Sequence, residues 1–235
     1  HTHTHTMDTT SWPIDGHYSW GQFVIVNGQR HRDELESLGY FGRDLDDIKR
    51  KLDSKRGPED HRILDSVPVT EDDGIRVILS LHEAFFLTYA LGSLVVKLNG
   101  TDSIIDIDTC WHEFRRYHRE TNMMTDFAVE FCVYYYFRTR GWIVKSGNNY
   151  GSTFLLYKRS PSLDHSPYAI QIVQPGERKL GWQTVLTHHR VIQSVNKGLL
   201  IVHVEHPTGV YDRPSSIKDM RVCIRKVTCK TSLIT

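Results

Sequence analysis

The 235-residue sequence has no long hydrophobic run, no excess of charge of either sign, and neither internal repeats nor low-complexity tracts. No apolar stretch approaches the ~20 residues that a membrane-spanning helix needs. We also identify no secretory leader, so we expect a soluble intracellular protein, nuclear or cytoplasmic. A net charge of +1 argues against a basic nucleic-acid coat, and contacts with nucleic acid would require local clusters of Lys and Arg.

The sequence has few cysteines, and their spacing matches no known paired motif. The four residues have no Cys-x-x-Cys spacing, which argues against a zinc knuckle and against a dithiol redox site. On one continuous strand, Cys223 and Cys229 would lie about 20 Å apart at 3.3 Å per residue, beyond disulfide reach. We therefore expect reduced, mostly buried thiols at Cys110, Cys132, Cys223 and Cys229.

The composition that remains is that of an ordinary globular protein of one large or two small domains. We interpret residues 1–6, HTHTHT, as an engineered metal-affinity tag. The predicted fold class is α+β, with a small N-terminal α/β domain at residues 7–122 and a second domain at residues 123–235. We expect this second domain to hold a mixed sheet flanked by helices, with the boundary near Asn122.

In the first half, residues 22–28 alternate as a strand does, within a Gly-rich region that suggests two or three short strands. Residues 45–57 have the thin apolar stripe of a charged surface helix. Ser80 and Glu83 form a capping-box pattern directly before an apolar run that ends at Gly92. This pattern predicts a buried helix.

Two further helices are predicted, with Asp106 and Thr125 as N-caps and with Gly141 closing the second. Aromatic residues at 134–137 could suggest an RNA-stacking platform, but their helical spacing favours the core. Beyond Gly141 the apolar period becomes two. The elements predicted there are strands at 142–145, 153–158, 168–173, 199–205 and 221–228, and a helix at 182–195.

The strand that contains Leu155 and Tyr157 is followed by a Ser-Pro-Ser turn cluster at residues 160–162. SPYAIQIV, residues 166–173, reads as the returning strand. Tyr157 ends the first strand and His165 begins the second, so we expect the two side chains to lie close together.

These residues carry a family resemblance. The motifs FRTRGW (137–142) and KSGNNYG (145–151) are followed by Tyr157, by His165 and by a helix running from Arg190 toward Lys197. In this order they resemble the catalytic subunits of archaeal and eukaryotic tRNA-splicing endonucleases. LSLHEAFFLTYALGSL (79–94) is similar to a segment of the eukaryotic catalytic subunit.

The chain departs from the family pattern at two positions. Thr153 stands where the family often has an acidic residue, and Ser160 stands where it usually has Gly. The first departure puts in doubt any role assigned to that acid. The second should alter only the turn, because Ser also forms turns.

The resemblance implies a restriction-endonuclease-like catalytic nuclease domain that cleaves precursor tRNA at exon–intron junctions of the bulge-helix-bulge type. It implies a catalytic triad of Tyr157, His165 and Lys197 that uses no metal and no other cofactor. The products would be a 2′,3′-cyclic phosphate and a 5′-hydroxyl. Histidine suits the acid, with an ordinary pKa near ~6.5, and lysine suits the developing phosphorane charge. Tyrosine is a poor base unless a cation lowers its pKa, so Tyr157 could instead orient the nucleophile.

The resemblance also implies RNA contacts and an assembly. Arg190, seven residues before Lys197, would lie on the same helix face and would clamp a bulged nucleotide with its guanidinium. The candidate RNA-binding residues are Arg190, Lys158, Arg225, Lys226 and Lys230, and the last three are unranked alternatives for the second clamp. The expected partners are precursor tRNA and a second copy of the chain or other subunits. Residues 221–228 would offer a pairing edge, and the loop at 206–219, with Glu205 and Asp212, would dock in a basic pocket.

Two alternatives remain open. A metal-dependent nuclease of related fold would hold Mg²⁺ on an acidic pair, and the central hairpin carries Thr153, Tyr157 and Lys158 but no such pair. A non-catalytic scaffold subunit would typically lack part of the triad, which is intact here. Cleavage of intron-containing tRNA in EDTA separates these readings.

Overall fold

The computed structural model describes residues 13–18, 21, 23–48, 74–101, 103–121, 125–173 and 181–228. The chain falls into two compact units, His1–Cys110 and Trp111–Thr235. The boundary predicted near Asn122 lies outside the described residues and stays a prediction, and the tag interpretation of residues 1–6 lies outside them too. Helices and mixed sheets together confirm the α+β class.

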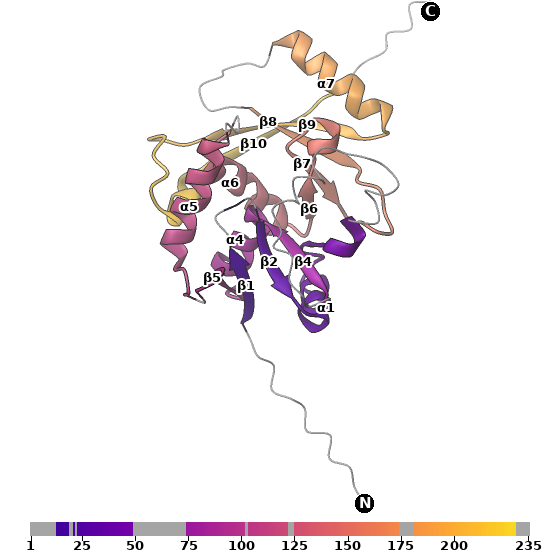
Figure 1. Cartoon of the computed structure of the whole chain (residues 1–235). Coiled ribbons are helices and arrows are strands. Elements are labelled where there is room, and N and C mark those ends of the chain that lie inside the picture. Colours follow the sequence, from indigo (N-terminus) through magenta and orange to yellow (C-terminus); the bar gives the residue numbers. More distant parts are fainter. Residues whose placement is uncertain are drawn as a thin grey trace, which may run out of the picture. The chain divides into compact units, whose positions relative to one another are not determined.

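The first unit is built on a five-stranded sheet with strand order β3-β4-β2-β1-β5 (Figure 1). Strand β1 runs parallel to β5 and antiparallel to β2, and β4 runs antiparallel to both β2 and β3. Its elements are β1 Ile14–Tyr18, β2 Phe23–Asn27, α1 Gln29–Ser37, β3 Arg43–Asp44, β4 Arg76–Ser80, α4 Leu81–Tyr89 and β5 Leu94–Leu98.

Helix α4 confirms the predicted capping box. The Ser80 hydroxyl accepts a hydrogen bond from the Glu83 backbone N–H at 3.2 Å, and the Glu83 carboxylate accepts one from the Ser80 N–H at 3.0 Å. The other Glu83 oxygen accepts from the Gly42 N–H at 3.0 Å. Helix α1 was not predicted, because its sequence is polar and buries only Leu35.

The second unit holds a five-stranded mixed sheet with strand order β10-β9-β8-β7-β6. Strands β8 and β9 are parallel, and the other neighbours are antiparallel. The elements are α5 Ile107–Glu120, which starts in the first unit, α6 Phe127–Arg138, β6 Ile143–Ser146, β7 Phe154–Tyr157, β8 Tyr168–Val173, α7 Trp182–Ser194, β9 Gly198–Glu205 and β10 Arg221–Lys226.

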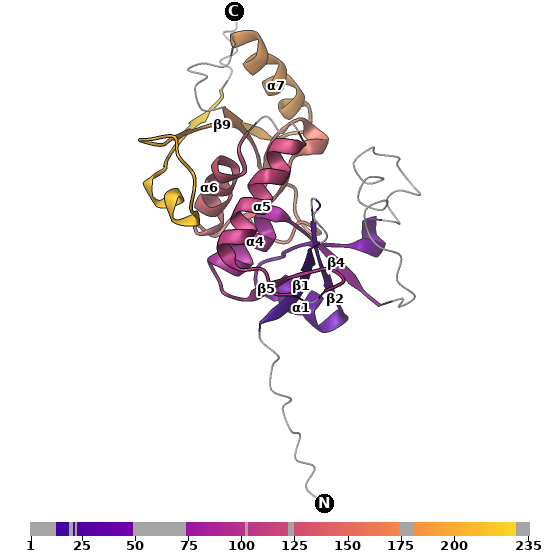
Figure 2. The same cartoon turned by 60° about the vertical axis from the view of Figure 1, so that its left-hand side comes forward.

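Helices α6 and α7 cover opposite faces of this second sheet (Figures 1 and 2). On the α6 face, the rings of Tyr134 and Phe154 meet edge to face at 5.9 Å. On the α7 face, Ile192 packs with Leu155 and Leu199. Side chains alternate along a strand, and cross-strand partners share a face. Residues in register with Phe154 therefore face α6, and residues in register with Leu155 face α7.

One predicted cap is wrong. Helix α6 is capped by Asp126, whose carboxylate accepts from the Ala128 N–H at 2.8 Å, and not by Thr125. The Asp126 carboxylate also receives two hydrogen bonds from Arg115, at 3.1 and 3.0 Å. This carboxylate therefore caps α6 and joins it to α5. The aromatic residues Tyr134 and Phe137 are buried, as the core interpretation predicted.

The thiols of Cys110 and Cys132 are free and buried. Burial raises the pKa of each to about 12. Both are thiols at neutral pH and are therefore poor nucleophiles. Cys223 is free and half-buried, and Cys229 lies outside the described residues. Within the described ranges, no helix combines the length and the apolar character that crossing a membrane requires.

Candidate active site

Tyr157 is the last residue of β7 and faces the same side as Leu155, toward α7. The phenol is half-buried against the cluster that contains Ile192. Burial is the main cause that raises the pKa of Tyr157, and the neighbouring Ser166 side chain acts against that rise. The net shift is upward, so the phenol is neutral at neutral pH.

A compact turn connects Tyr157 with His165. The Leu163 and Asp164 backbone N–H groups both donate to the Ser160 carbonyl at 3.0 Å. Ser160 is itself buried. His165 follows the turn with an exposed side chain, and the next residue, Ser166, is buried.

Lys197 is placed by the way α7 ends. The helix stops at Ser194, and Asn196 adopts the left-handed conformation at φ 57° that often terminates helices. The Lys197 backbone then leads directly into β9. The expectation that Arg190 and Lys197 share one helix face is therefore wrong, because Lys197 lies beyond the helix.

The Lys197 ammonium reaches across to the hairpin. Its Nζ donates to the Ser166 carbonyl at 3.2 Å and lies 5.3 Å from the centre of the Tyr150 ring. Partial burial lowers the pKa of Lys197. The amine nevertheless keeps two partners that favour its charged form, a carbonyl oxygen and an aromatic face.

Lys197 thus contacts Ser166 and Tyr150, and Tyr150 and Tyr157 both pack against the α7-face cluster. His165 is the chain neighbour of Ser166, about 3.8 Å away along the backbone. The three predicted catalytic residues therefore all lie at the end of the sheet where β7 stops and β8 and β9 start. A phenol, an imidazole and an ammonium group are available there for proton transfer and for charge stabilisation.

Sequence reasoning missed Tyr150 and Ser166. Tyr150 lies in a 3₁₀ turn, Asn148–Tyr150, and its N–H donates to the Gly147 carbonyl at 2.8 Å. A Cβ on Gly147 would collide with Ser152, so this turn requires glycine there. The Tyr-Gly pair was part of the motif but suggested only a turn, because nothing local indicates that the Tyr150 ring faces a lysine 47 residues later.

The predicted RNA-binding residues divide between the two faces of the sheet. Val227 packs in the α7-face cluster, so alternation puts Arg225 on that face and Lys226 on the other. Arg225 lies opposite Ile201, which belongs to the same cluster as Ile192 of α7. The remaining candidates are Arg190, exposed on α7, Lys158, exposed after β7, and Lys230, outside the described residues.

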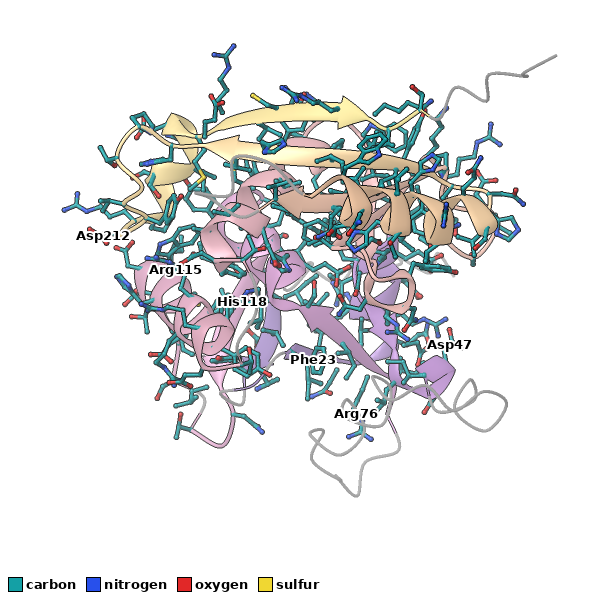
Figure 3. All side chains as sticks on the ribbon, turned by 90° about the horizontal axis from the view of Figure 1, so that it is seen from above. Phe23, Asp47, Arg76, Arg115, His118 and Asp212 are labelled. Atoms are coloured by element: carbon teal, nitrogen blue, oxygen red, sulfur yellow. The ribbon has the colours of Figure 1, made fainter. Side chains whose placement is uncertain are left out.

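The loop at residues 206–219 is anchored by α5. The Tyr211 carbonyl accepts from Trp111 Nε1 at 2.9 Å and from the Arg115 guanidinium at 2.6 Å. The next residue, Asp212, is exposed, and Figure 3 shows it at the same corner of the unit as Arg115. The anchor therefore fixes the backbone of the loop and leaves its carboxylate in solvent.

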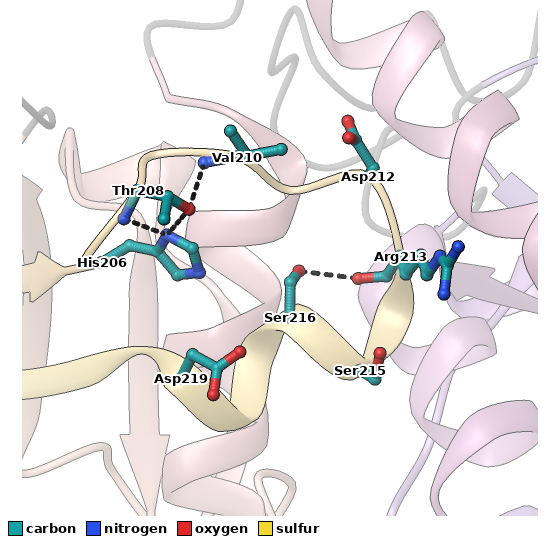
Figure 4. A pocket seen from close by; sticks show the side chains of 8 residues that line it. All are labelled: His206, Thr208, Val210, Asp212, Arg213, Ser215, Ser216 and Asp219. Carbon is teal, nitrogen blue, oxygen red and sulfur yellow. Dashed lines mark hydrogen bonds between the residues drawn. The ribbon is translucent and has the colours of Figure 1, made fainter.

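The same loop folds around His206. Its Nδ1 accepts from the Gly209 N–H at 2.9 Å and from the Thr208 N–H at 3.3 Å (Figure 4). An open pocket of about 280 Å³ lies inside the turn and carries two carboxylates and one guanidinium. Its lining residues are His206, Thr208, Val210, Asp212, Arg213, Ser215, Ser216 and Asp219.

Comparison with known proteins points to one family. Residues 127–211 match the family model of the tRNA intron endonuclease catalytic C-terminal domain. The chain is 34% identical over 156 residues to tRNA-splicing endonuclease subunit Sen2-1 of Arabidopsis thaliana, covering 65% of this chain and 63% of that protein. It is 27% identical over 164 residues to subunit Sen2 of Gallus gallus, covering 67% of this chain and 33% of that protein.

An archaeal relative is matched over most of its length. The tRNA-splicing endonuclease of Pyrobaculum islandicum is 29% identical over 189 residues, with 80% of this chain and 90% of that protein covered. The chain thus spans less than two thirds of the two eukaryotic relatives but nearly all of the archaeal one.

Proposed function

We infer from these matches that the chain belongs to the tRNA-splicing endonuclease family, and from that premise we propose that it cuts precursor tRNA at its exon–intron junctions. The proposed reaction needs no metal ion and leaves a 2′,3′-cyclic phosphate and a 5′-hydroxyl. The observation that carries the proposal is the contact of Lys197 with the Ser166 carbonyl at 3.2 Å. This contact holds the lysine beside the residue that directly follows His165.

In the proposed reaction the 2′-hydroxyl gives up its proton to solvent, its oxygen forms a bond to the adjacent phosphorus, and the bond from phosphorus to the 5′-oxygen breaks. His165 donates a proton to the departing 5′-oxygen, a role that suits an exposed imidazole at neutral pH. The Lys197 ammonium stabilises the extra negative charge on the pentacoordinate phosphorus. Its position between a carbonyl and an aromatic ring fixes that charge before the substrate arrives.

Tyr157 orients the 2′-hydroxyl in this scheme. Its raised pKa opposes formation of a phenolate, so the neutral phenol is the species that meets the substrate. A role as general base would require bound RNA to bring the Lys197 charge closer and lower the pKa. Tyr157→Phe distinguishes the two roles, because loss of an orienting contact costs less than loss of the base.

We propose that Arg190 and Arg225 form the clamp for a bulged nucleotide. Arg190 is exposed on α7, and Arg225 shares the sheet face that α7 covers, whereas Lys226 points to the opposite face. Guanidinium groups stack on bases, which an ammonium group does not. The shared sheet face and the ability of a guanidinium group to stack both favour Arg225 over Lys226 as the second clamping residue.

Two splice sites must be cut, so we propose that the chain works as a homodimer or together with other splicing-endonuclease subunits. Among the described residues, strand β10 is an edge strand of its sheet, and an edge strand offers backbone groups for pairing with a partner. The anchored loop would present Asp212 to a basic pocket of that partner. Size-exclusion chromatography with light scattering tests the homodimer, and a monomer at working concentration would exclude it.

Single-turnover cleavage of an intron-containing precursor tRNA tests the catalytic proposal. We expect His165→Ala to lose cleavage and to keep RNA binding, while His112→Ala keeps both. His112 is also exposed, so it is a matched control for loss of an imidazole. Cleavage by His165→Ala at the wild-type rate would refute the assignment of the acid.

A further inference from the structure

Two lysines and two aromatic rings form a continuous row in the second unit. Lys158 Nζ lies 6.0 Å from the centre of the Trp142 ring, and Trp142 meets the Tyr168 ring edge to face at 5.9 Å. Lys226 Nζ lies 5.4 Å from the centre of the Tyr168 ring. We call these residues, Lys158, Trp142, Tyr168 and Lys226, the cation–aromatic row.

The strand register explains why the row lies on the α6 face. Leu156 and Lys158 follow Phe154 at two-residue steps, and Phe154 contacts Tyr134 of α6. Tyr168 pairs with Leu156 and therefore shares its face. Trp142 immediately precedes Ile143, the partner of Tyr157, so Trp142 lies opposite Lys158.

Gly198 makes the row continuous across β9. It pairs with Tyr168, and a Cβ at this position would lie 2.9 Å from the Tyr168 ring. The ring therefore occupies the space that a side chain on β9 would fill. This placement lets Tyr168 reach Lys226 on β10, two strands away.

The row is available to a ligand and is positively charged. Lys158 and Lys226 are exposed, and the two rings are half-buried. Neither lysine has a carboxylate partner among the residues that the structure describes. The rings hold the ammonium groups in place, which reduces the side-chain entropy that a ligand must otherwise overcome. Fixed cations beside aromatic edges suit a polyanion that carries flat bases.

We propose that the cation–aromatic row binds a single-stranded segment of the RNA that flanks the cleaved phosphate, an inference that rests on the proposed function. Lys158 directly follows Tyr157, and Lys197 directly precedes Gly198, so the row and the candidate active site lie at one end of the sheet on opposite faces. An RNA strand that leaves the active site around this end meets the row. Its phosphates pair with the lysines, and an unpaired base contacts the rings.

Binding of two RNA probes by the full chain tests this proposal. One probe is a single-stranded oligoribonucleotide of about ten nucleotides, within the usual site size. The other is a precursor tRNA with 2′-deoxyribose at both cut sites, which removes the proposed nucleophile. Affinity is measured at several salt concentrations for wild type, for the double variant Lys158→Ala with Lys226→Ala, and for Lys218→Ala. Lys218 is exposed outside the row, in the 3₁₀ turn Pro214–Asp219, and serves as the charge-matched control.

We expect the double variant to bind both probes about 10-fold more weakly. The slope of log affinity against log salt should fall by about 1.4, since each phosphate contact to single-stranded RNA contributes about 0.7. Lys218→Ala should bind like wild type. The proposal is overturned if the double variant binds like Lys218→Ala, or if both variants weaken binding equally. Preferential binding of an acidic peptide that the double variant abolishes would assign the row to a protein partner instead and also overturn it.

A ring variant tests whether the aromatics contribute through the lysines. We expect Trp142→Leu to weaken binding about 3-fold in the wild-type background and less when Lys158 is already Ala, within the usual cation–π range. Equal effects of Trp142→Leu in both backgrounds would show that Trp142 does not act through Lys158. Cleavage is measured separately: if wild type binds through the row but never cuts, the proposed function fails and the row stands.

Discussion

The two faces of the second sheet differ most at the end where β7 stops and β9 starts. Toward α7, Tyr157 and Lys197 are half-buried, Lys197 contacts the Ser166 carbonyl and the Tyr150 ring, and burial shifts the pKa of both tyrosine and lysine. Toward α6, lysines stand in solvent above half-buried rings. One face is suited to proton and charge chemistry, and the other to holding a polyanion.

The strand period produces this difference. Tyr157 and Lys158 are neighbours in sequence, as are Arg225 and Lys226, and in each pair the two side chains point to opposite faces. Adjacent residues are therefore expected to respond differently to the same substitution. The variants below test the difference between the two faces, from the largest expected effect to the smallest.

On the α7 face, His165→Ala should reduce single-turnover cleavage by about 10²- to 10⁴-fold, the usual contribution of a general acid. A precursor with sulfur in place of the departing 5′-oxygen should restore most of the rate, because a thiolate leaves without a proton. Rates on the two substrates are compared for wild type and variant. Failure of the sulfur substrate to rescue the variant would argue that His165 does not act as the acid.

Lys197→Ala should reduce cleavage by about 10²- to 10³-fold, as loss of one charge-stabilising donor does elsewhere. The lowered pKa of Lys197 also predicts a pH effect. Activity that needs the ammonium is complete below this pKa and is lost as pH rises through it, at a pH below the ordinary lysine value of ~10.4.

Lys197→Arg keeps its positive charge at alkaline pH, so the loss of activity should move to a higher pH. The rate–pH profile is best measured on the sulfur substrate, whose thiolate leaves without a proton. If Lys197→Arg loses activity at the same alkaline pH as wild type, a group other than Lys197 causes that loss.

The Arg225 and Lys226 pair tests the two faces most directly. Arg225→Ala should slow cleavage of bulged RNA by about 5- to 100-fold, the range for loss of stacking on one base, and should couple with Arg190→Ala in a double-mutant cycle. Lys226→Ala should weaken binding without such coupling. If Lys226 couples with Arg190 and Arg225 does not, the assignment of faces to tasks is reversed.

Tyr150→Leu should reduce the cleavage rate about 2- to 5-fold, as expected from one cation–π contact, and should leave KM unchanged. Tyr150→Phe keeps the ring and should behave like wild type. In the Lys197→Ala background Tyr150→Leu should have no further effect. An equal loss in both backgrounds would mean that Tyr150 acts independently of the lysine.

Period and capping signals predicted most of the second unit. Strand β8 was predicted at residues 168–173 and lies there, and α7 was predicted within one residue of its end. These elements have strong alternation or an apolar stripe of their own. Helix α1 and the Asp126 cap were missed, because α1 buries a single leucine and because Thr125 and Asp126 are adjacent and both are favoured N-cap residues.

The candidate site was predicted only in part, for a related reason. Spacing and resemblance singled out Tyr157, His165 and Lys197, but the ring of Tyr150 faces Lys197 through tertiary packing alone. The Trp142, Tyr168 and Gly198 contacts depend on the register of four strands, which no local pattern reveals. Once the strand register is known, the alternation of side chains assigns Arg225 and Lys226 to opposite faces of the sheet.

The central claim is that Tyr157, His165 and Lys197 cut RNA without a metal ion. The most direct measurement is cleavage of an intron-containing precursor tRNA in excess EDTA, with identification of the product ends. The account predicts accurate cleavage that yields 2′,3′-cyclic phosphate and 5′-hydroxyl termini and that His165→Ala abolishes. Cleavage that stops in EDTA and returns with a divalent cation, or that leaves 5′-phosphate ends, would contradict it.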